Sequence, residues 1–117
     1  MNEIVRMSTG TRDVLIVHVE VDLDVAGCGR VAAQLMPLTR GDGFDRVVVD
    51  VTGRFVSARG LRVLAHAVTT ATGAGCSWAV VGLSGLPLRL CAQWYPAVPV
   101  HESVSRAARA LGGVARR

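Results

Sequence analysis

The sequence predicts an α/β domain, in which a mixed, mostly parallel sheet of about four to five strands is flanked by about four helices. Residues 47–51 form an almost unbroken β-branched run, which is typical of a strand buried on both faces. Residues 58–72 then carry apolar side chains at helical spacing. Strand and helix patterns alternate from residue 14 onward, which predicts parallel strands joined by crossover helices.

The first part of the chain predicts a hairpin followed by a helix. Residues 3–8 suit a short edge strand, and the alternating residues 14–21 suit a strand antiparallel to it. Asp24 is a good N-cap for the next helix, and Pro37 should end or kink that helix. The glycines in residues 41–43 predict a loop before the central strand.

The second part continues the alternation after the helix over residues 58–72. Glycines at residues 73–75 predict its end. The remaining elements are expected in this order: a buried strand at 78–82, a short helix at 84–92, an aromatic loop at 94–96, an edge strand at 97–100, and a last helix capped by Ser103 and ended by the glycines at 112–113.

Length and composition indicate one domain spanning residues 1–117, with half of its 117 residues hydrophobic. No run reaches the length of a membrane span, and the N-terminus lacks the pattern of a signal peptide. We therefore expect a cytoplasmic protein without a membrane partner. Cys28, Cys76 and Cys91 form no C-x-x-C pair and are expected to be reduced, mostly buried thiols.

The net charge of +4 comes with 13 basic residues, all of them arginine. The absence of lysine excludes a Walker P-loop and Schiff-base chemistry. The arginines are scattered rather than clustered, so we expect no nucleic-acid partner. His18, His66 and His101 share no ligand spacing, and we expect neither a metal nor another cofactor.

The junction between the central strand and its helix carries the most specific motif. Residues 55–61 read Phe-Val-Ser-Ala-Arg-Gly-Leu, and residues 19–24 read Val-Glu-Val-Asp-Leu-Asp. The first stretch resembles the signature loop of STAS domains, the fold of bacterial anti-sigma factor antagonists, and the second resembles the Gly-Glu-Leu-Asp-Leu stretch of that family. Their spacing and the order of elements match over nearly the whole chain. The resemblance implies a single STAS-like domain that binds protein and does no chemistry.

The same resemblance implies a partner and a docking surface. The partner would be an anti-sigma factor with a serine-kinase-type ATP-binding fold, which controls sigma-dependent transcription. It would dock on the loop and helix start of the motif and on the neighbouring aspartate loop. The residues expected to bind it are Asp22, Asp24, Ser57, Ala58, Arg59, Gly60 and Arg62.

The chain departs from the family at the site of control. Ala58 stands at the position where the family carries its phosphoacceptor serine, and Ser57 stands where it has aspartate. Ser57 is a candidate phosphoacceptor, but a plain N-cap is much the commoner role for a serine at this place. Arg59 replaces a small hydroxyl residue, and its charge opposes the helix dipole, so it invites an acidic partner or an anion.

Other interpretations remain open at this stage. One is a small-molecule or nucleotide sensor that binds an anion at the helix start near Arg59 and the 82–86 turn. A cysteine enzyme is disfavoured, because no arginine lies six residues after Cys28 or Cys91. Trp94 and Tyr95 fit either a partner anchor or a cover for the end of the sheet core. The sequence leaves a homodimer open.

Overall fold

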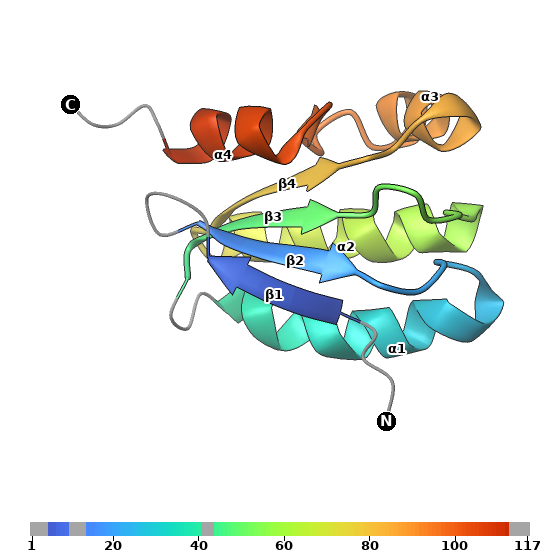
Figure 1. Ribbon diagram of the computed structural model, residues 1–117, viewed down its shortest axis with the longest axis horizontal. Coiled ribbons are helices and arrows are strands. Elements are labelled where there is room, and N and C mark those ends of the chain that lie inside the picture. Colours follow the sequence, from blue (N-terminus) through green and yellow to red (C-terminus); the bar gives the residue numbers. More distant parts are fainter. Residues whose placement is uncertain (1–4, 10–13, 41–43, 113–117) are drawn as a thin grey trace.

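The computed structural model describes residues 5–9, 14–40 and 44–112. Its strands are β1 (Val5–Thr9), β2 (Leu15–Val19), β3 (Arg46–Asp50), β4 (Ser77–Val81) and β5 (Val100–His101). They form one sheet in the order β1-β2-β3-β4-β5. β1 pairs antiparallel to β2, and the other neighbours pair in parallel. The predicted mixed, mostly parallel sheet is therefore confirmed (Figure 1).

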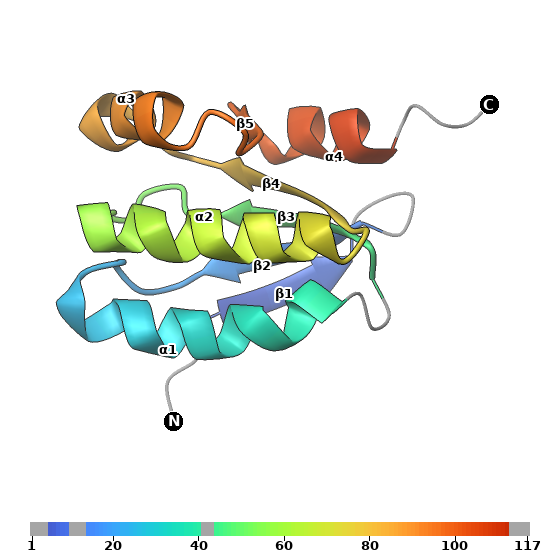
Figure 2. The same ribbon diagram turned by 180° about the vertical axis from the view of Figure 1, so that it is seen from behind.

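Four α-helices connect or follow these strands: α1 (Val25–Leu35), α2 (Ala58–Gly73), α3 (Gly85–Trp94) and α4 (Val104–Gly112). α1 and α2 lie side by side on one face of the sheet (Figure 2). α4 packs on the other face against β3 and β4. The helices thus cover both faces, which is the layered arrangement that a mostly parallel sheet requires.

The central strand explains this layering. Val47 and Val49 of β3 belong to the large core beneath α1 and α2, whereas Val48 belongs to the smaller core beneath α4. All three side chains are essentially inaccessible to solvent. The β-branched run is therefore a strand buried on both faces, as the sequence predicts.

Several boundaries differ from the sequence-based expectation, but the end of the first helix is as predicted: α1 stops at Leu35, just before Pro37, and the chain continues as the 3₁₀ segment η2 (Met36–Arg40). The expected strand at 97–100 reduces to β5, since Pro99 has no N–H and only its carbonyl joins the ladder, accepting from the Val80 amide. Trp94 lies in α3 rather than in a loop. The helix over 58–72 extends through Gly73. Residues 3–4, 41–43 and 113 of the expected elements lie outside the described residues.

Candidate functional site

The candidate site lies at the carboxyl edge of the parallel strands, where the β2–α1, β3–α2 and β4–α3 loops meet. In an open α/β sheet this edge is the usual place for binding, because helix starts and strand ends converge there. Figure 1 shows the starts of α1, α2 and α3 at the same end of the molecule. The site is built by the contacts that hold these three loops together.

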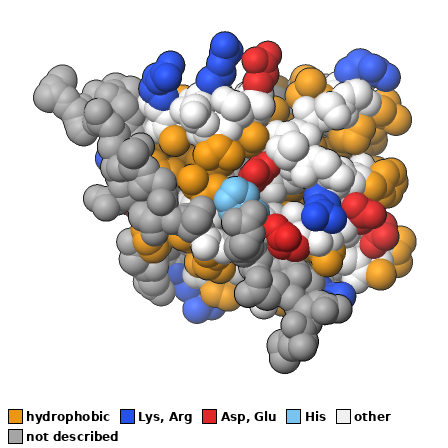
Figure 3. Space-filling model, viewed as in Figure 1, with side chains coloured by type: hydrophobic (Ala, Val, Ile, Leu, Met, Phe, Trp, Pro, Cys, Tyr) orange, Lys and Arg blue, Asp and Glu red, His pale blue; other side chains and the backbone are white. Residues whose placement is uncertain are grey.

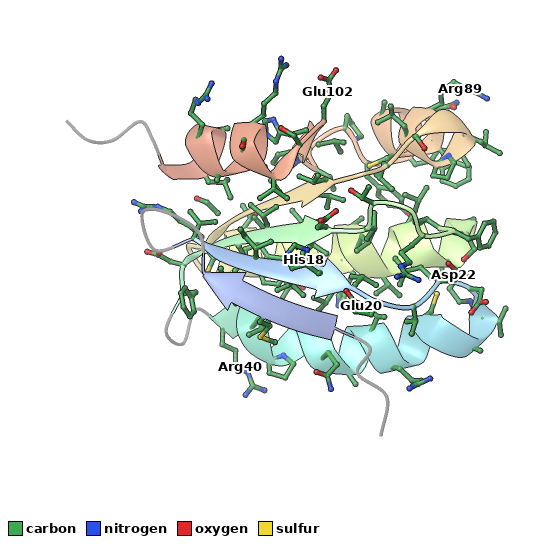
Figure 4. The ribbon with its side chains drawn as sticks, viewed as in Figure 1. His18, Glu20, Asp22, Arg40, Arg89 and Glu102 are labelled. Atoms are coloured by element: carbon green, nitrogen blue, oxygen red, sulfur yellow. The ribbon has the colours of Figure 1, made fainter. Side chains whose placement is uncertain are left out.

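Asp22 ties the first loop to the second. Its carboxylate accepts a hydrogen bond from the Phe55 amide at 3.0 Å, and the Leu23 amide donates to the Phe55 carbonyl at 2.8 Å. An isolated parallel bridge between Leu23 and Val56 extends the pairing beyond the strands. Figure 4 shows Asp22 in the loop after β2, at this same edge. The two stretches that carry the STAS-like motifs are therefore in direct contact.

Asp24 has the capping role that the sequence predicts. One carboxylate oxygen accepts from the amides of Ala26 at 3.1 Å and Gly27 at 2.9 Å. Gly27 is buried beneath this turn, and a Cβ there would lie 2.1 Å from the Asp22 carbonyl oxygen. Asp24 thus fixes the start of α1 by hydrogen bonds within its own turn.

Asp50 and Thr52 set the turn after β3. The Asp50 carboxylate accepts from the Thr52 amide at 2.9 Å and from the Thr52 hydroxyl at 2.5 Å, and it lies 3.1 Å from the His18 ring. Burial raises the pKa of Asp50, but the hydrogen bonds from Thr52 and His18 outweigh this effect and hold it below the ordinary 3.8. Gly53 then adopts a φ of +79°, which favours glycine and reverses the chain. The hydrogen bonds of this turn therefore stabilise the charged form of Asp50.

Ser57 begins α2 and uses its hydroxyl twice. The oxygen accepts from the Gly60 amide at 3.0 Å, and the hydroxyl donates to the Leu23 carbonyl at 2.7 Å. The Ser57 amide donates to the same carbonyl at 3.0 Å. Ser57 is half-buried and acts as N-cap and as a link to the first loop. A phosphate on this oxygen would replace the hydroxyl hydrogen and so remove the bond to the Leu23 carbonyl.

The first turn of α2 divides the expected binding residues into two groups. Ala58, Arg59 and Arg62 are exposed, so their side chains are accessible to a partner. Gly60 is buried, and a Cβ there would lie 2.7 Å from both the Cβ and the carbonyl oxygen of Leu23. Gly60 therefore serves the close packing of α2 against the first loop, whereas its neighbours form the surface.

The third loop closes the site from the other side. Gly82 has a φ of +100°, and a Cβ there would lie 2.4 Å from the Thr52 amide nitrogen. The close approach of the β4–α3 loop to the β3–α2 loop therefore requires glycine at this position. Between these two loops lies a pocket of about 680 Å³. The sequence-based sensor interpretation named the start of α2 and the 82–86 turn, which both border this pocket, but it did not single out Arg54.

The pocket is lined mainly by apolar residues of both loops and both helix starts. Among the lining residues are Arg54, Phe55, Ala58, Leu83, Leu86 and Leu90. Arg59 does not line the pocket, although one sequence-based interpretation placed an anion site near this residue. Ser57 and Ala58 do line the pocket, so it adjoins the expected docking residues.

Large apolar side chains are exposed at all three helix starts. Val25 is 81% exposed at the start of α1, Phe55 is 60% exposed just before α2, and Leu86 is 56% exposed in the first turn of α3. Figure 3 shows hydrophobic side chains along the edge where Figure 1 places these helix starts. Scattered single apolar residues are ordinary on a surface, but a row along one functional edge indicates an interaction site.

Three other groups of candidate residues are the cysteines, the metal-ligating side chains and the aromatic pair. The three cysteines are free and buried, and burial raises the pKa of Cys91. Within the described ranges, no group of three or more metal-ligating side chains comes together. Trp94 is half-exposed and stacks edge-on against Tyr95, and the Tyr95 ring packs on the core. In the same part of the chain, no helix is long and apolar enough to cross a membrane.

No family model matches the sequence, and no curated protein matches it by sequence. Solved structures do match the fold. An anti-sigma factor antagonist from Mycobacterium paratuberculosis aligns with a TM-score of 0.74 at 17% identity, over 92% of each chain. RsbS from Moorella thermoacetica, in a serine-to-glutamate variant, aligns with a TM-score of 0.77 at 16% identity, over 97% of this chain and 98% of that one. The chain has the fold of a STAS domain.

Two further structures show how widely this STAS fold is used. The phosphorylated form of the Bacillus cell fate determinant SpoIIAA aligns with a TM-score of 0.68 at 9% identity, over 89% of this chain and 95% of that one. A murine anion transporter, Slc26a9, contains the fold in 18% of its length, with a TM-score of 0.69 at 19% identity over 86% of this chain. At such identities the likeness establishes the fold, and function has to be argued from the site.

Proposed function

We propose that this chain is a non-enzymatic regulatory module of the anti-sigma factor antagonist type. Its partner is an anti-sigma factor with a serine-kinase-type ATP-binding fold, and both act in the cytoplasm to control sigma-dependent transcription. The observation that carries the proposal is the carboxyl edge itself. The β2–α1 and β3–α2 loops are joined by hydrogen bonds, and the β4–α3 loop approaches the latter closely at Gly82; together they present exposed apolar residues and two exposed arginines on a STAS fold.

Protein binding suits this surface better than chemistry does. Val25, Phe55 and Leu86 offer apolar area of the kind that anchors an interface, and Arg59 and Arg62 beside them supply charge complementarity. Asp22 and Asp24 use their carboxylates to shape the loops. We infer that these two aspartates position the docking surface, while Ala58, Arg59 and Arg62 contact the partner.

Phospho-control takes a different form in this proposal. Ala58 has no hydroxyl, and the Ser57 hydroxyl donates to one backbone group and accepts from another. Phosphorylation of Ser57 would cost the bond to the Leu23 carbonyl, because the phosphate replaces the hydroxyl hydrogen. We therefore propose that the chain docks its partner without phosphorylation at the position where the family carries it.

Affinity capture with the intact protein tests the docking proposal. Bound proteins are identified by mass spectrometry, and the candidate partner is then titrated in purified form against the parent and against Arg62→Glu. Docking through this edge predicts a loss of about tenfold or more for the variant. Light scattering of the protein alone distinguishes docking from a homodimer that would cover the same edge. Equal binding by both proteins would place the functional face elsewhere, with Trp94 as the next surface to test.

Intact-mass measurement tests the control proposal. The protein is incubated with ATP and the captured partner, and little or no added phosphate is expected. A gain of one phosphate that disappears in Ser57→Ala would show that the acceptor has moved by one residue and that phospho-control persists.

A small-molecule sensor is the second candidate, and the pocket beside the docking residues favours it. A nucleotide at Arg59 fits this pocket poorly, because Arg59 does not line it and only one charged residue does among the described residues. Thermal-shift measurements with nucleotides and with phosphorylated metabolites test this candidate directly. The chemistry of the pocket points to another ligand class.

A further inference from the structure

The pocket between the β3–α2 and β4–α3 loops has the size and composition of a small-ligand site. Its volume of about 680 Å³ falls within the usual range of roughly 300–1,000 Å³ for such sites. Val56, Leu61 and Leu83 are buried and form its inner lining, whereas Phe55 and Leu86 are exposed and stand at its mouth. A ligand that enters this pocket would move from water into contact with apolar side chains on two sides.

The described residues that line the pocket include few polar side chains and no acidic one. Arg54 is exposed and is the single charged residue among the described residues that line it; no aspartate or glutamate appears among them. Within the described part of the chain, Arg54 also enters no ion pair. Ser84 lines the pocket as well, and its hydroxyl makes no cap hydrogen bond to α3. A guanidinium and a hydroxyl are thus available at an otherwise apolar site.

These features favour a ligand that carries one negative charge and is otherwise apolar. A guanidinium pairs in a bidentate manner with a carboxylate, and the surrounding apolar side chains strengthen that pair by excluding water. A polyanion such as a nucleoside triphosphate would find one cation for several charges. A neutral apolar molecule would leave the arginine unused. The lining therefore matches a monoanion with an aliphatic or aromatic tail.

We propose that this pocket binds a small amphipathic carboxylic acid, with its tail between Phe55, Leu86 and Leu90 and its carboxylate on Arg54. The same pocket includes Ser57 and Ala58, which belong to the proposed docking surface. A bound acid therefore competes with the partner protein. This regulatory consequence rests on the proposed function, whereas ligand binding itself does not.

Octanoate is the probe, titrated into the isolated full chain and followed by calorimetry and by amide shifts in NMR spectra. We expect saturable binding at one site, with perturbed amides confined to residues 53–61 and 82–90. Octanol has the same tail without the charge and should bind about tenfold more weakly, while octylamine should bind more weakly still. Equal binding of all three probes, or no saturable binding of octanoate, overturns the proposal.

Two variants locate the site. Arg54→Gln should weaken octanoate about tenfold and change octanol less than twofold, because only the charged contact is lost. Arg59→Gln is the matched control: it removes the same charge from an exposed position outside the pocket and should leave octanoate unchanged. Ala58→Phe places bulk at the mouth from an exposed first-turn position, and it should weaken both probes at least fivefold.

These experiments distinguish a failure of the ligand proposal from a failure of the proposed partner docking. Octanoate binding in the isolated chain decides the ligand proposal, whatever partner is found. If octanoate fails to bind while Ala58→Phe still abolishes partner docking, the pocket holds a side chain of the partner and the ligand proposal is wrong. If octanoate binds at Arg54 but does not displace an identified partner, the competitive control is wrong.

Discussion

The starts of α2 and α3 look alike in sequence and differ in construction. Each helix begins after a serine, Ser57 for α2 and Ser84 for α3, and each borders the same pocket. The Ser57 hydroxyl caps the third helical residue, Gly60, whereas the Ser84 hydroxyl makes no cap bond. The third helical residue of α3 is Pro87, which has no N–H to offer. A serine at an N-cap position is therefore structural at one helix and available at the other.

This difference distinguishes the residues that hold the carboxyl edge together from the residues that are available for binding. The α2 start is fixed to the β2–α1 loop through Leu23, and its serine and glycine are both committed. The α3 start exposes Leu86, and Ser84, whose hydroxyl makes no cap bond, lines the pocket. Changes in the committed groups should lower stability, and changes in the exposed groups should alter binding.

The largest effect is expected at Gly60. Gly60→Ala places a Cβ 2.7 Å from backbone and side-chain atoms of Leu23, so the helix start must move away from the first loop. We expect a loss of at least about 2 kcal/mol in the free energy of unfolding, measured by urea denaturation.

Gly29→Ala is the matched control for that change. Gly29 also lies inside a helix, but a Cβ there has no atom within 4 Å. This variant should gain about 0.5–1 kcal/mol through helix propensity. If both variants change stability alike, the tight contact between α2 and the first loop does not exist.

The serine pair tests the comparison directly. Ser57→Ala removes a cap bond, and the Leu23 carbonyl keeps the Ser57 amide as its donor. We expect a loss of about 1–2 kcal/mol, again by urea denaturation, from the lost cap and the lost link. Ser84→Ala should cost less than about 0.5 kcal/mol, because no cap bond is lost. Equal losses would show that the two serines share one role.

Acid sensitivity should follow the turn before α2. The depressed pKa of Asp50 stabilises the fold at pH values above the ordinary 3.8, and that contribution is lost as the pH falls through the lowered folded value. Asp50→Asn should therefore flatten the acid limb of a stability–pH curve measured by chemical denaturation. Asp45→Asn removes a carboxylate from an exposed position before β3 and should leave the limb as it is. An unchanged curve for Asp50→Asn would show that the Asp50 carboxylate does not contribute to the stability of the fold at these pH values.

The central strand and the helix caps were predictable from the sequence because their signals are local. The β-branched run at 47–51 predicts double-sided burial, and Asp24 and Ser57 precede clear helical patterns. The resemblance in residues 55–61 also predicted the STAS fold. These features depend on residues within a few positions of one another.

What the sequence could not supply depends on distant pairs. The bond from the Phe55 amide to Asp22 joins residues 33 positions apart, and the pocket unites loops from two different strands. Arg54 became a candidate only when the fold placed it beside Leu86 and Leu90. The short β5 strand was overestimated for a related reason, because its length is set by its partner β4 and by Pro99 rather than by its own composition.

A small gain in stability is expected from an acid at the second helical residue, which is Arg59 in α2 and Leu86 in α3. An acid suits this end of a helix, so Arg59→Glu should raise the free energy of unfolding by about 0.3–1 kcal/mol. The same change should weaken docking of the partner about tenfold, roughly 1.4 kcal/mol, through like-charge repulsion. Stability and binding then move in opposite directions, which damage to the fold cannot imitate. Leu86→Glu is the companion at the α3 start: it gains the same dipole term but loses an exposed apolar anchor, so octanoate binding should fall with docking. If Arg59→Glu weakens octanoate as well, the two helix starts do not act as separate surfaces.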